Sequence, residues 1–205
     1  QFRILIMGIS VMGVVDFMIR FSAYVLIYSA FLCVVGFLLE KVYRLLFSRR
    51  RYFAKATVLI TGGSEGIGLE TAKQVLKRGA SRVILLSRSL RKLKLAKAEI
   101  LQQNSRLADD QILLFAADVT DTHTHTGIVP TLHKIMQQLK GNLDYLVCAQ
   151  GLALPGYILA RPKNDTSVME AHMNVNAIGT MRVVQTILPY MDDAGSGHIT
   201  MISSM

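Results

Sequence analysis

Apolar and polar positions follow two different patterns along this chain. Residues 21–39 contain no Asp, Glu, Lys or Arg, whereas beyond residue 56 short β-branched runs alternate with longer segments of helical periodicity. Strands and helices that alternate at this spacing indicate βαβ units and a parallel sheet. We therefore expect an α/β fold with a doubly wound parallel sheet over residues 57–205. The predicted strands are residues 57–61, 82–87, 111–116, 143–148 and 198–202, and the predicted helices are residues 66–78, 90–104, 125–139 and 168–191.

The uncharged stretch at residues 21–39 is long enough to cross a membrane. As a helix it spans roughly 28 Å, close to the thickness of the bilayer hydrocarbon. An earlier apolar run, residues 4–15, is separated from it by Asp16 and Arg20, and it fits a hairpin partner, a re-entrant piece or part of one long tilted helix. A cleaved signal peptide is disfavoured, because the apolar region is too long. We expect a membrane anchor over residues 1–47, with a transmembrane helix at about 21–39.

Positive charge follows this apolar segment in the sequence. Lys41, Arg44 and the basic run at residues 49–51 lead into a linker over residues 48–56. By the positive-inside rule, such a flank places the following domain in the cytosol.

The net charge of +9 does not by itself indicate a nucleic-acid partner. A second basic cluster, from Arg88 to Lys97, lies along the predicted helix at residues 90–104 and is typical of a solvated helix face with one functional member. No aromatic stacking series or reading helix accompanies the charge, so nucleic-acid binding is not expected.

Cysteine and histidine usage adds little chemistry. Cys33 and Cys148 form no readable disulfide framework, which suits a reducing compartment. His123 and His125 lack further ligands at useful spacing, so no metal site is expected.

The strongest local motif joins the first predicted strand to the first predicted helix of the α/β region. An apolar strand ending at Thr61 runs into a glycine turn that opens a helix. Glycines there let the backbone turn sharply and approach a pyrophosphate, whose charge meets the helix N-terminus. An ordinary tight turn is the alternative. The expected cofactor-binding residues of this motif are Gly62, Ser64, Glu65, Gly66, Ile67 and Gly68.

The end of the second predicted strand bears on which cofactor binds. A NAD site carries an acid about twenty residues after the glycine motif to hold the ribose 2′-hydroxyl. This chain has Ser87 and Arg88 at that point and no carboxylate. A guanidinium and a hydroxyl suit a 2′-phosphate, so NADPH is the predicted cofactor. Alternatively, Arg88 is only a surface residue at a helix start.

The glycine spacing, Gly-x-x-x-Gly-x-Gly directly after Thr61, resembles that of the short-chain dehydrogenase/reductase family. The resemblance extends over residues 57–205 and implies a Rossmann-type fold. It also implies that Asp118, followed by Val119, lies near the adenine. The family's Asn-Asn-Ala-Gly stretch reads Cys-Ala-Gln-Gly at residues 148–151, so only the backbone role of Gly151 carries over.

The same resemblance implies two catalytic residues. By register with Gly179, Asn176 rather than Asn174 matches the family's asparagine, which would hold a water in a proton relay. Ser204, the second serine after the fifth predicted strand, matches the serine that polarises the substrate carbonyl.

The family's proton donor, a tyrosine in Tyr-x-x-x-Lys, has no counterpart in this sequence. Tyr157 with Arg161 is the nearest imitation, in a predicted loop. We therefore expect the sequence to be incomplete at its C-terminus and the chain as given to be inactive. A sheet that ends with the strand at residues 198–202 leaves an unpaired edge, which favours association into a homo-oligomer.

Within the family, the sequence is most similar to the 3-ketodihydrosphingosine (3-dehydrosphinganine) reductases. The similarity rests on residues 143–157, on Gly179 with Thr180, and on residues 188–191. It implies NADPH-dependent reduction of a long-chain keto lipid at the endoplasmic reticulum membrane, with the catalytic domain facing the cytosol. Other anchored reductases, acting on 3-ketoacyl-CoA, retinoids or steroids, remain alternatives, as does a non-catalytic nucleotide-binding membrane protein.

Overall fold

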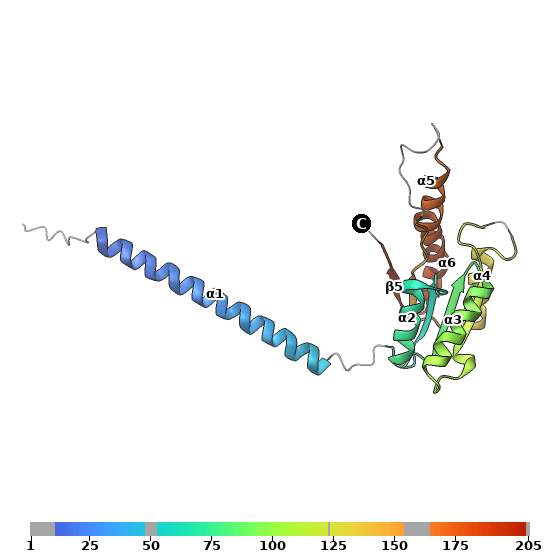
Figure 1. The fold of residues 1–205 in the computed structure, drawn as a ribbon, viewed down its shortest axis with the longest axis horizontal. Helices are drawn as coiled ribbons and strands as arrows, with labels where there is room; N and C mark the ends of the chain where they lie inside the picture. Colours follow the sequence, from blue (N-terminus) through green and yellow to red (C-terminus); the bar gives the residue numbers. More distant parts are fainter. Residues whose placement is uncertain (1–10, 48–52, 123, 154–164, 204–205) are drawn as a thin grey trace, which may run out of the picture. The chain divides into compact units, whose positions relative to one another are not determined.

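A computed structural model of the chain describes residues 11–47, 53–122, 124–153 and 165–203. Contacts between Cα atoms divide the chain into two units, Gln1–Arg50 and Arg51–Met205. The described part of the first unit is a single helix, and the second unit contains a sheet with its helices (Figure 1). The unit boundary lies inside the predicted basic linker.

Helix α1, Val11–Phe47, forms the described part of the first unit. It is continuous through the charged interruption, where Arg20 Nε lies 2.9 Å from the Asp16 carboxylate one helical turn away. Residues 11–15 therefore belong to the same helix as residues 21–39, which favours the long-helix alternative; residues 4–10 lie outside the described part. Within the described residues one helical stretch, Val15–Tyr43, is apolar and long enough to cross a membrane, with a mean hydropathy of 2.2.

The second unit is built on a five-stranded parallel sheet with the order β3-β2-β1-β4-β5. The strands are β1 Thr57–Thr61, β2 Arg82–Ser87, β3 Ile112–Ala116, β4 Tyr145–Cys148 and β5 His198–Met201. The chain moves outward from β1 to β3, then returns to pair β4 with the other side of β1. This arrangement confirms the predicted α/β doubly wound sheet, and it creates a switch point between β1 and β4.

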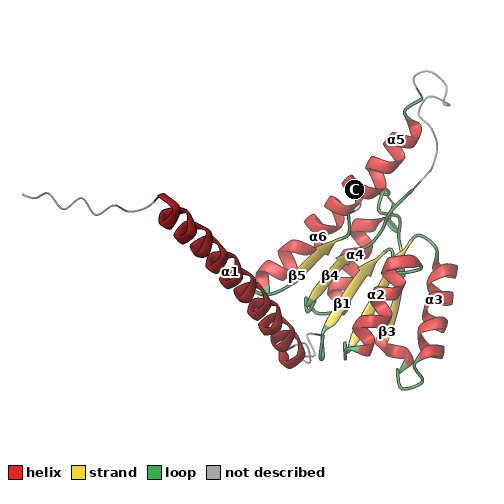
Figure 2. Cartoon of the chain, turned by 60° about the vertical axis from the view of Figure 1, so that its left-hand side comes forward, coloured by secondary structure: helices red, strands yellow, loops and turns green. Residues whose placement is uncertain are grey.

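Helices cover both faces of the sheet (Figure 2). Helices α2, Gly66–Lys77, and α3, Leu90–Gln103, pack on one face, while α4, Ile128–Gln138, and α6, Gly179–Asp193, pack on the other. Because side chains alternate along a strand, Val58 and Ile60 face α2 and α3, whereas Leu59 between them faces α4 and α6. All three are fully buried. The buried strands therefore read as continuous apolar runs, as expected for a parallel sheet.

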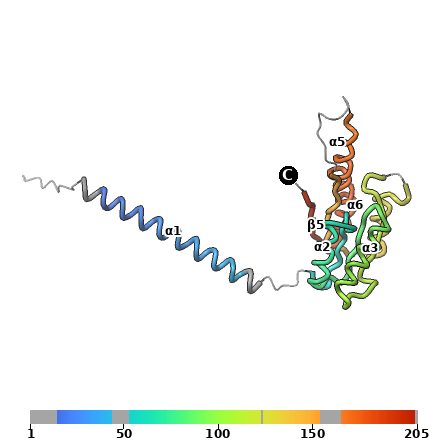
Figure 3. Tube along the Cα trace, viewed as in Figure 1, coloured from blue at the N-terminus to red at the C-terminus, as the bar shows by residue number. Residues whose placement is uncertain are grey.

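The predicted helix at residues 168–191 is interrupted in the structure. It consists of α5, Ser167–His172, a π-helical segment η3, Met173–Ile178, and α6. The Cα trace passes from one into the next without a break (Figure 3). A π-helical turn rotates the side chains that follow it and is frequent at functional sites. Sequence periodicity did not reveal it, and Asn176 lies within it.

Several other predicted boundaries moved by one to three residues, and two of these shifts have a local reason in the hydrogen bonds. Helix α4 begins at Ile128 rather than residue 125, because a turn closes before it: Gly127 N–H donates to Thr124 O at 2.9 Å and Ile128 N–H donates to Asp121 O at 3.0 Å. Strand β3 is preceded by the 3₁₀ turn η1, Asp109–Gln111, which takes up the first residue predicted as strand.

Candidate functional site

A cleft of about 560 Å³ opens at the carboxyl ends of the strands. We call it the strand-end cleft. Segments that follow β1, β2, β3 and β4 all line it, so it lies at the switch point of the sheet, where parallel α/β sheets bind their ligands. Its volume falls within the range of pockets for drug-sized ligands and cofactors. Its walls include residues 62, 64–67, 86–89, 92, 117, 119, 149–151 and 175.

The glycine turn after β1 forms the floor of the strand-end cleft. Gly62 has φ +68°, and a Cβ there would lie 2.6 Å from Ala149 O. A Cβ on Gly68 would lie 2.3 Å from Gly62 O. Gly68 does not line the cleft; it lets α2 pack against the turn. Gly66 has φ +57°, and nothing lies within 4 Å of its would-be Cβ.

The N-terminus of α2 faces the same turn. Its N-cap residue, Glu65, has extended backbone with φ −162° and makes no side-chain cap to the helix. The first N–H groups of a helix have no partner within the helix. An anion placed over Gly66 would meet these donors and the positive end of the helix dipole. The turn therefore fits a diphosphate group.

One end of the strand-end cleft is formed by the last residue of β2 and the residues that follow it. The Oγ atom of Ser87 is buried and has no hydrogen-bond partner among the described residues. A buried hydroxyl without a partner is costly, and a ligand oxygen would remove that cost. Arg88 follows it in the cleft wall, and neither position supplies a carboxylate. These groups fit a phosphorylated ribose.

Sequence reasoning missed an ion pair beside this end. Lys92, in the first turn of α3, lines the strand-end cleft, and its Nζ donates to both carboxylate oxygens of Glu65 at 2.9 and 3.0 Å. Lys92 therefore reaches the site in addition to Arg88, which precedes α3, and only the packing of α3 beside the glycine turn reveals this.

Of the two residues predicted to lie near the adenine, one lines the strand-end cleft and the other forms hydrogen bonds within a neighbouring turn. Val119 lines the strand-end cleft, while Asp118 does not. The Asp118 carboxylate instead accepts from Thr120 N–H at 2.8 Å and from the Thr120 hydroxyl at 2.7 Å. Gly179 lies close to Val119, because a Cβ added to this glycine would lie only 2.7 Å from Val119 Cγ2. Arg182 also donates to Val119 O at 3.2 Å. An adenine contact by Asp118 stays a prediction.

Gln150, which departs from the family pattern, joins β1 to the helix across the cleft. Its Oε1 accepts from the Thr61 hydroxyl, and its Nε2 donates to Thr180 Oγ1 at 2.7 Å. Thr180 in turn donates to Asn176 O at 2.8 Å. The amide therefore fixes the loop after β4, including Gly151, which lines the cleft. The departure of this sequence from Asn-Asn-Ala-Gly marked Gln150 as unusual. Its hydrogen-bond partners, Thr61 and Thr180, could not be predicted from that departure.

Asn176 contacts the same loop one residue further on. Its Oδ1 accepts from Leu152 N–H at 2.7 Å, and its Nδ2 donates to Leu152 O at 3.0 Å. The side chain of Val175, its neighbour, reaches the wall of the cleft. Asn176 is thus beside the site, anchored to its loop.

Three residues considered for the chemistry lie outside the described part of the chain: Ser204, Tyr157 and Arg161. Ser203 is described and exposed, and it follows β5. Strand β5 pairs with β4 so that Met201 lies opposite Cys148. The catalytic role of Ser204 stays a prediction, as does self-association along the β5 edge.

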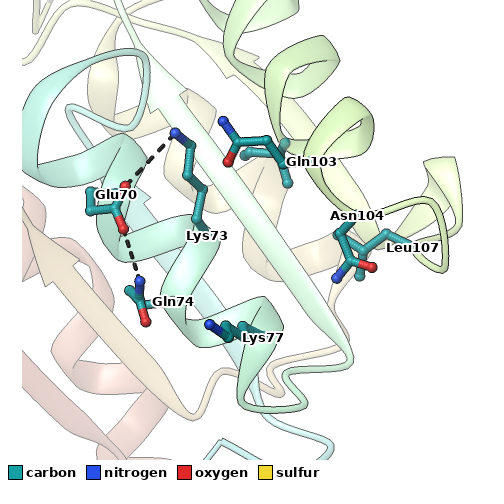
Figure 4. Close-up of a pocket in the computed structure, with 8 residues that line it drawn as sticks. Glu70, Lys73, Gln74, Lys77, Gln103, Asn104 and Leu107 are labelled. Atoms are coloured by element: carbon teal, nitrogen blue, oxygen red, sulfur yellow. Dashed lines mark hydrogen bonds and ion pairs between the residues drawn. The ribbon is translucent and has the colours of Figure 1, made fainter.

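A second cleft, of about 380 Å³, lies between α2 and α3 on the outside of the sheet (Figure 4). Lys73 is its central charge, with its Nζ 2.6 Å from Glu99 and 3.7 Å from Glu70. The hydrogen bond with Glu99 raises the pKa of Lys73. Gln74 also donates to Glu70, at 2.8 Å. These side chains pair with one another through ion pairs and a hydrogen bond. We therefore interpret this cleft as a groove of the packing between α2 and α3 rather than as a ligand site.

Comparison with known proteins agrees with the geometry. The family model described as short chain dehydrogenase matches residues 56–205. Dehydrogenase/reductase SDR family member 7 from Mus musculus is 32% identical over 148 residues, covering 72% of this chain and 41% of that protein. The 3-ketodihydrosphingosine reductase of Dictyostelium discoideum is 27% identical over 158 residues, covering 72% of this chain and 46% of that protein. The chain therefore spans less than half the length of either relative.

A solved structure matches the fold as well. A metagenomic short-chain oxidoreductase in complex with NADP is 27% identical, with a TM-score of 0.62, over 75% of this chain and 64% of that one. The parallel sheet, the glycine turn at its switch point and the family model thus lead to one assignment. This chain belongs to the short-chain dehydrogenase/reductase family of oxidoreductases.

Proposed function

We propose that the protein reduces the 3-keto group of 3-ketodihydrosphingosine with NADPH, at the cytosolic face of the endoplasmic reticulum membrane. The observation that carries the cofactor choice is the end of β2, where Ser87 Oγ, buried and without a partner among the described residues, and Arg88 line the strand-end cleft and neither position supplies a carboxylate. A 2′-phosphate would accept from both groups, whereas positions 87 and 88 offer an unphosphorylated ribose no acid where a NAD site carries one after its second strand.

Different residues of the chain would bind the cofactor, fix the loop beside it and orient the substrate carbonyl. When bound, the cofactor supplies a hydride from its nicotinamide ring. The N–H groups at the start of α2 hold the diphosphate, and Gln150 and Asn176 fix the loop that lines the opposite wall. Ser204 is proposed to donate a hydrogen bond to the substrate carbonyl, which polarises it for attack. The proton donor is assigned to no residue of this sequence.

The choice of a lipid substrate rests on two supports. A reductase of 3-ketodihydrosphingosine is among the relatives of this chain. The apolar stretch Val15–Tyr43 suits a bilayer anchor, and a long-chain keto lipid partitions into the same bilayer. The basic residues that follow it favour a cytosolic position for the α/β unit.

A second candidate is another membrane-anchored reductase of the same family. The SDR family member 7 of Mus musculus is 32% identical to this chain, above the 27% of the Dictyostelium enzyme. The two candidates share the cofactor site and differ in the carbonyl compound they reduce, so substrate assays separate them.

The substrate is tested with membranes that contain the complete protein, by following NADPH oxidation. Oxidation with 3-ketodihydrosphingosine, lost in a Ser204→Ala variant of equal abundance, supports the proposal. Oxidation with 3-ketoacyl-CoA, retinal or a ketosteroid but not with 3-ketodihydrosphingosine overturns the substrate and favours the second candidate.

The cofactor and the orientation are tested separately. Arg88→Gln is expected to weaken NADPH binding by about tenfold or more while leaving NADH binding within about twofold, because one charge-assisted contact is lost. Equal loss for both nucleotides would remove the NADPH assignment. In sealed microsomes, protease should digest the α/β unit without detergent; protection of that unit would place it in the lumen instead.

A further inference from the structure

Lys92 and Glu65 bring opposite charges to the end of the strand-end cleft where Ser87 and Arg88 lie. Lys92 Nζ contacts both Glu65 oxygens, at 2.9 and 3.0 Å, and both side chains line the cleft. Their side chains remain 46% and 69% exposed. An ion pair this exposed is weak and exchanges readily with other partners. Lys92 is therefore available to a stronger anion at the same place.

The backbone positions Lys92 toward this end of the cleft. Ser89 is the N-cap of α3, and its hydroxyl accepts from Lys92 N–H at 3.3 Å. Residues 87, 88, 89 and 92 all line the cleft. A single short segment, residues 87–92 at the end of β2 and the start of α3, thus supplies a buried hydroxyl, a guanidinium and an ammonium.

Glu65 has the opposite effect on the same space. It is the N-cap of α2, where a carboxylate lies beside the N–H groups that fit a diphosphate. Its charge repels a phosphate, and it holds Lys92 in the absence of one. A 2′-phosphate, with a charge near −2, attracts an ammonium more strongly than one carboxylate does at equal distance. A cofactor without that phosphate brings no anion to the end of β2 that could compete with Glu65 for Lys92.

From this geometry we infer that the Glu65–Lys92 pair sets how strongly the protein prefers NADPH over NADH. Lys92 stays on Glu65 when the ribose is unphosphorylated and moves to the 2′-phosphate when it is present. Lys92 then raises NADPH affinity, and Glu65 limits that gain by competing for the ammonium. The inference rests on the proposed use of NADPH and adds the residues that tune it.

The test measures the Kd of NADPH and of NADH for four variants of the complete protein in detergent. The rise in nicotinamide fluorescence on binding reports each complex. The variants are Lys92→Met, Glu65→Gln, the double substitution, and the control Lys94→Met. Lys94 is exposed on the same helix and does not line the cleft.

Lys92→Met is expected to weaken NADPH about tenfold and to leave NADH within about twofold, the effect of one charge-assisted contact. Glu65→Gln should tighten NADPH by a few-fold, and more than it tightens NADH, roughly the effect of freeing one exposed ion pair. In the double variant the NADPH-selective gain from Glu65→Gln should vanish, because the ammonium it frees is absent. Lys94→Met should match the unmodified protein, and all variants should keep its thermal midpoint.

Two results overturn the inference while leaving the proposed function intact. One is a protein that prefers NADPH but is changed no more by Lys92→Met than by Lys94→Met. The other is a Glu65→Gln gain that is equal for NADPH and NADH, or that persists in the double variant. An unmodified protein that binds NADH as tightly as NADPH would instead refute the proposed cofactor, and the inference with it.

Discussion

The amide of Asn176 forms two hydrogen bonds with the backbone of Leu152, accepting from its N–H at 2.7 Å and donating to its carbonyl at 3.0 Å. The pair joins the π-helical segment η3 to the loop that follows β4. It uses one of the amide's two N–H donors and one of its two acceptor lone pairs. The remaining donor and acceptor can hold a water, so anchoring the loop and serving a proton relay are compatible.

Replacing Asn176 by alanine is expected to release the loop after β4. Loss of both bonds should lower the free energy of unfolding by roughly 1–2 kcal/mol. Hydrogen exchange at the Leu152 amide should accelerate, while amides in β1 keep their protection. Asn174→Ala, two positions earlier on the same segment, is the matched control; equal acceleration in both variants would contradict the anchoring role.

A substitution of Gly68 by alanine tests the packing of α2 on the glycine turn. The new Cβ would lie 2.3 Å from Gly62 O, so the turn must shift, at a cost of about 1–3 kcal/mol. Cofactor binding should fall with it, because the N–H groups at the start of α2 move. At Gly141, with φ +80° and nothing within 4 Å of a Cβ, alanine should cost about 1 kcal/mol from backbone strain alone and leave binding unchanged.

Substitution of Ser87 by alanine is expected to weaken NADPH binding without lowering the free energy of unfolding. Its Oγ is buried without a hydrogen-bond partner among the described residues, so Ser87→Ala should leave stability unchanged or raise it by up to about 1 kcal/mol. NADPH affinity should fall by about tenfold or more, the effect of one hydrogen bond to a charged group. Ser89→Ala should instead destabilise the protein by about 1 kcal/mol, since it removes the N-cap of α3. A marked stability loss in Ser87→Ala would show that its hydroxyl is satisfied within the fold.

Cys148 should make stability fall at high pH. Burial at the end of β4 raises its pKa from 9.0 to about 11, only partly offset by a hydrogen bond with Thr61. The pKa of Cys148 is higher in the folded protein than in the unfolded one. The contribution of the buried thiol to the free energy of unfolding is therefore fully present below about pH 8.5. It is lost as the pH rises toward 11, by roughly 2–3 kcal/mol in total.

Chemical unfolding of the unmodified protein and of Cys148→Ala at a series of pH values checks this. The difference in free energy of unfolding between the two should change between pH 8 and pH 11 and stay constant below pH 8. A constant difference throughout would mean that the thiol is not desolvated. Comparing the two proteins cancels the titration of Lys and Tyr residues in the same range.

The alternation of short apolar runs with segments of helical periodicity was enough to predict the parallel sheet and the helices that cover it. Buried parallel strands are continuous apolar runs, and the glycine turn at Gly62 requires residues without a side chain, so both leave local marks in the sequence. All of the predicted cofactor residues except Gly68 and Asp118 line the strand-end cleft, although Val119 and Gly151 were predicted from the family resemblance rather than from a local pattern. The uncharged stretch of α1 is equally local and was recognised by its length.

The sequence by itself determined the elements, their order and the glycine turn, because each depends on neighbours within a few positions. Only the tertiary structure decided that Lys92 reaches Glu65, that Gln150 joins Thr61 to Thr180, and that Asn176 holds Leu152 from a π-helical turn. These contacts join residues that are 24 to 89 positions apart. They depend on how the helices pack across the sheet, and that packing follows from burying all the apolar faces at once rather than from any local motif.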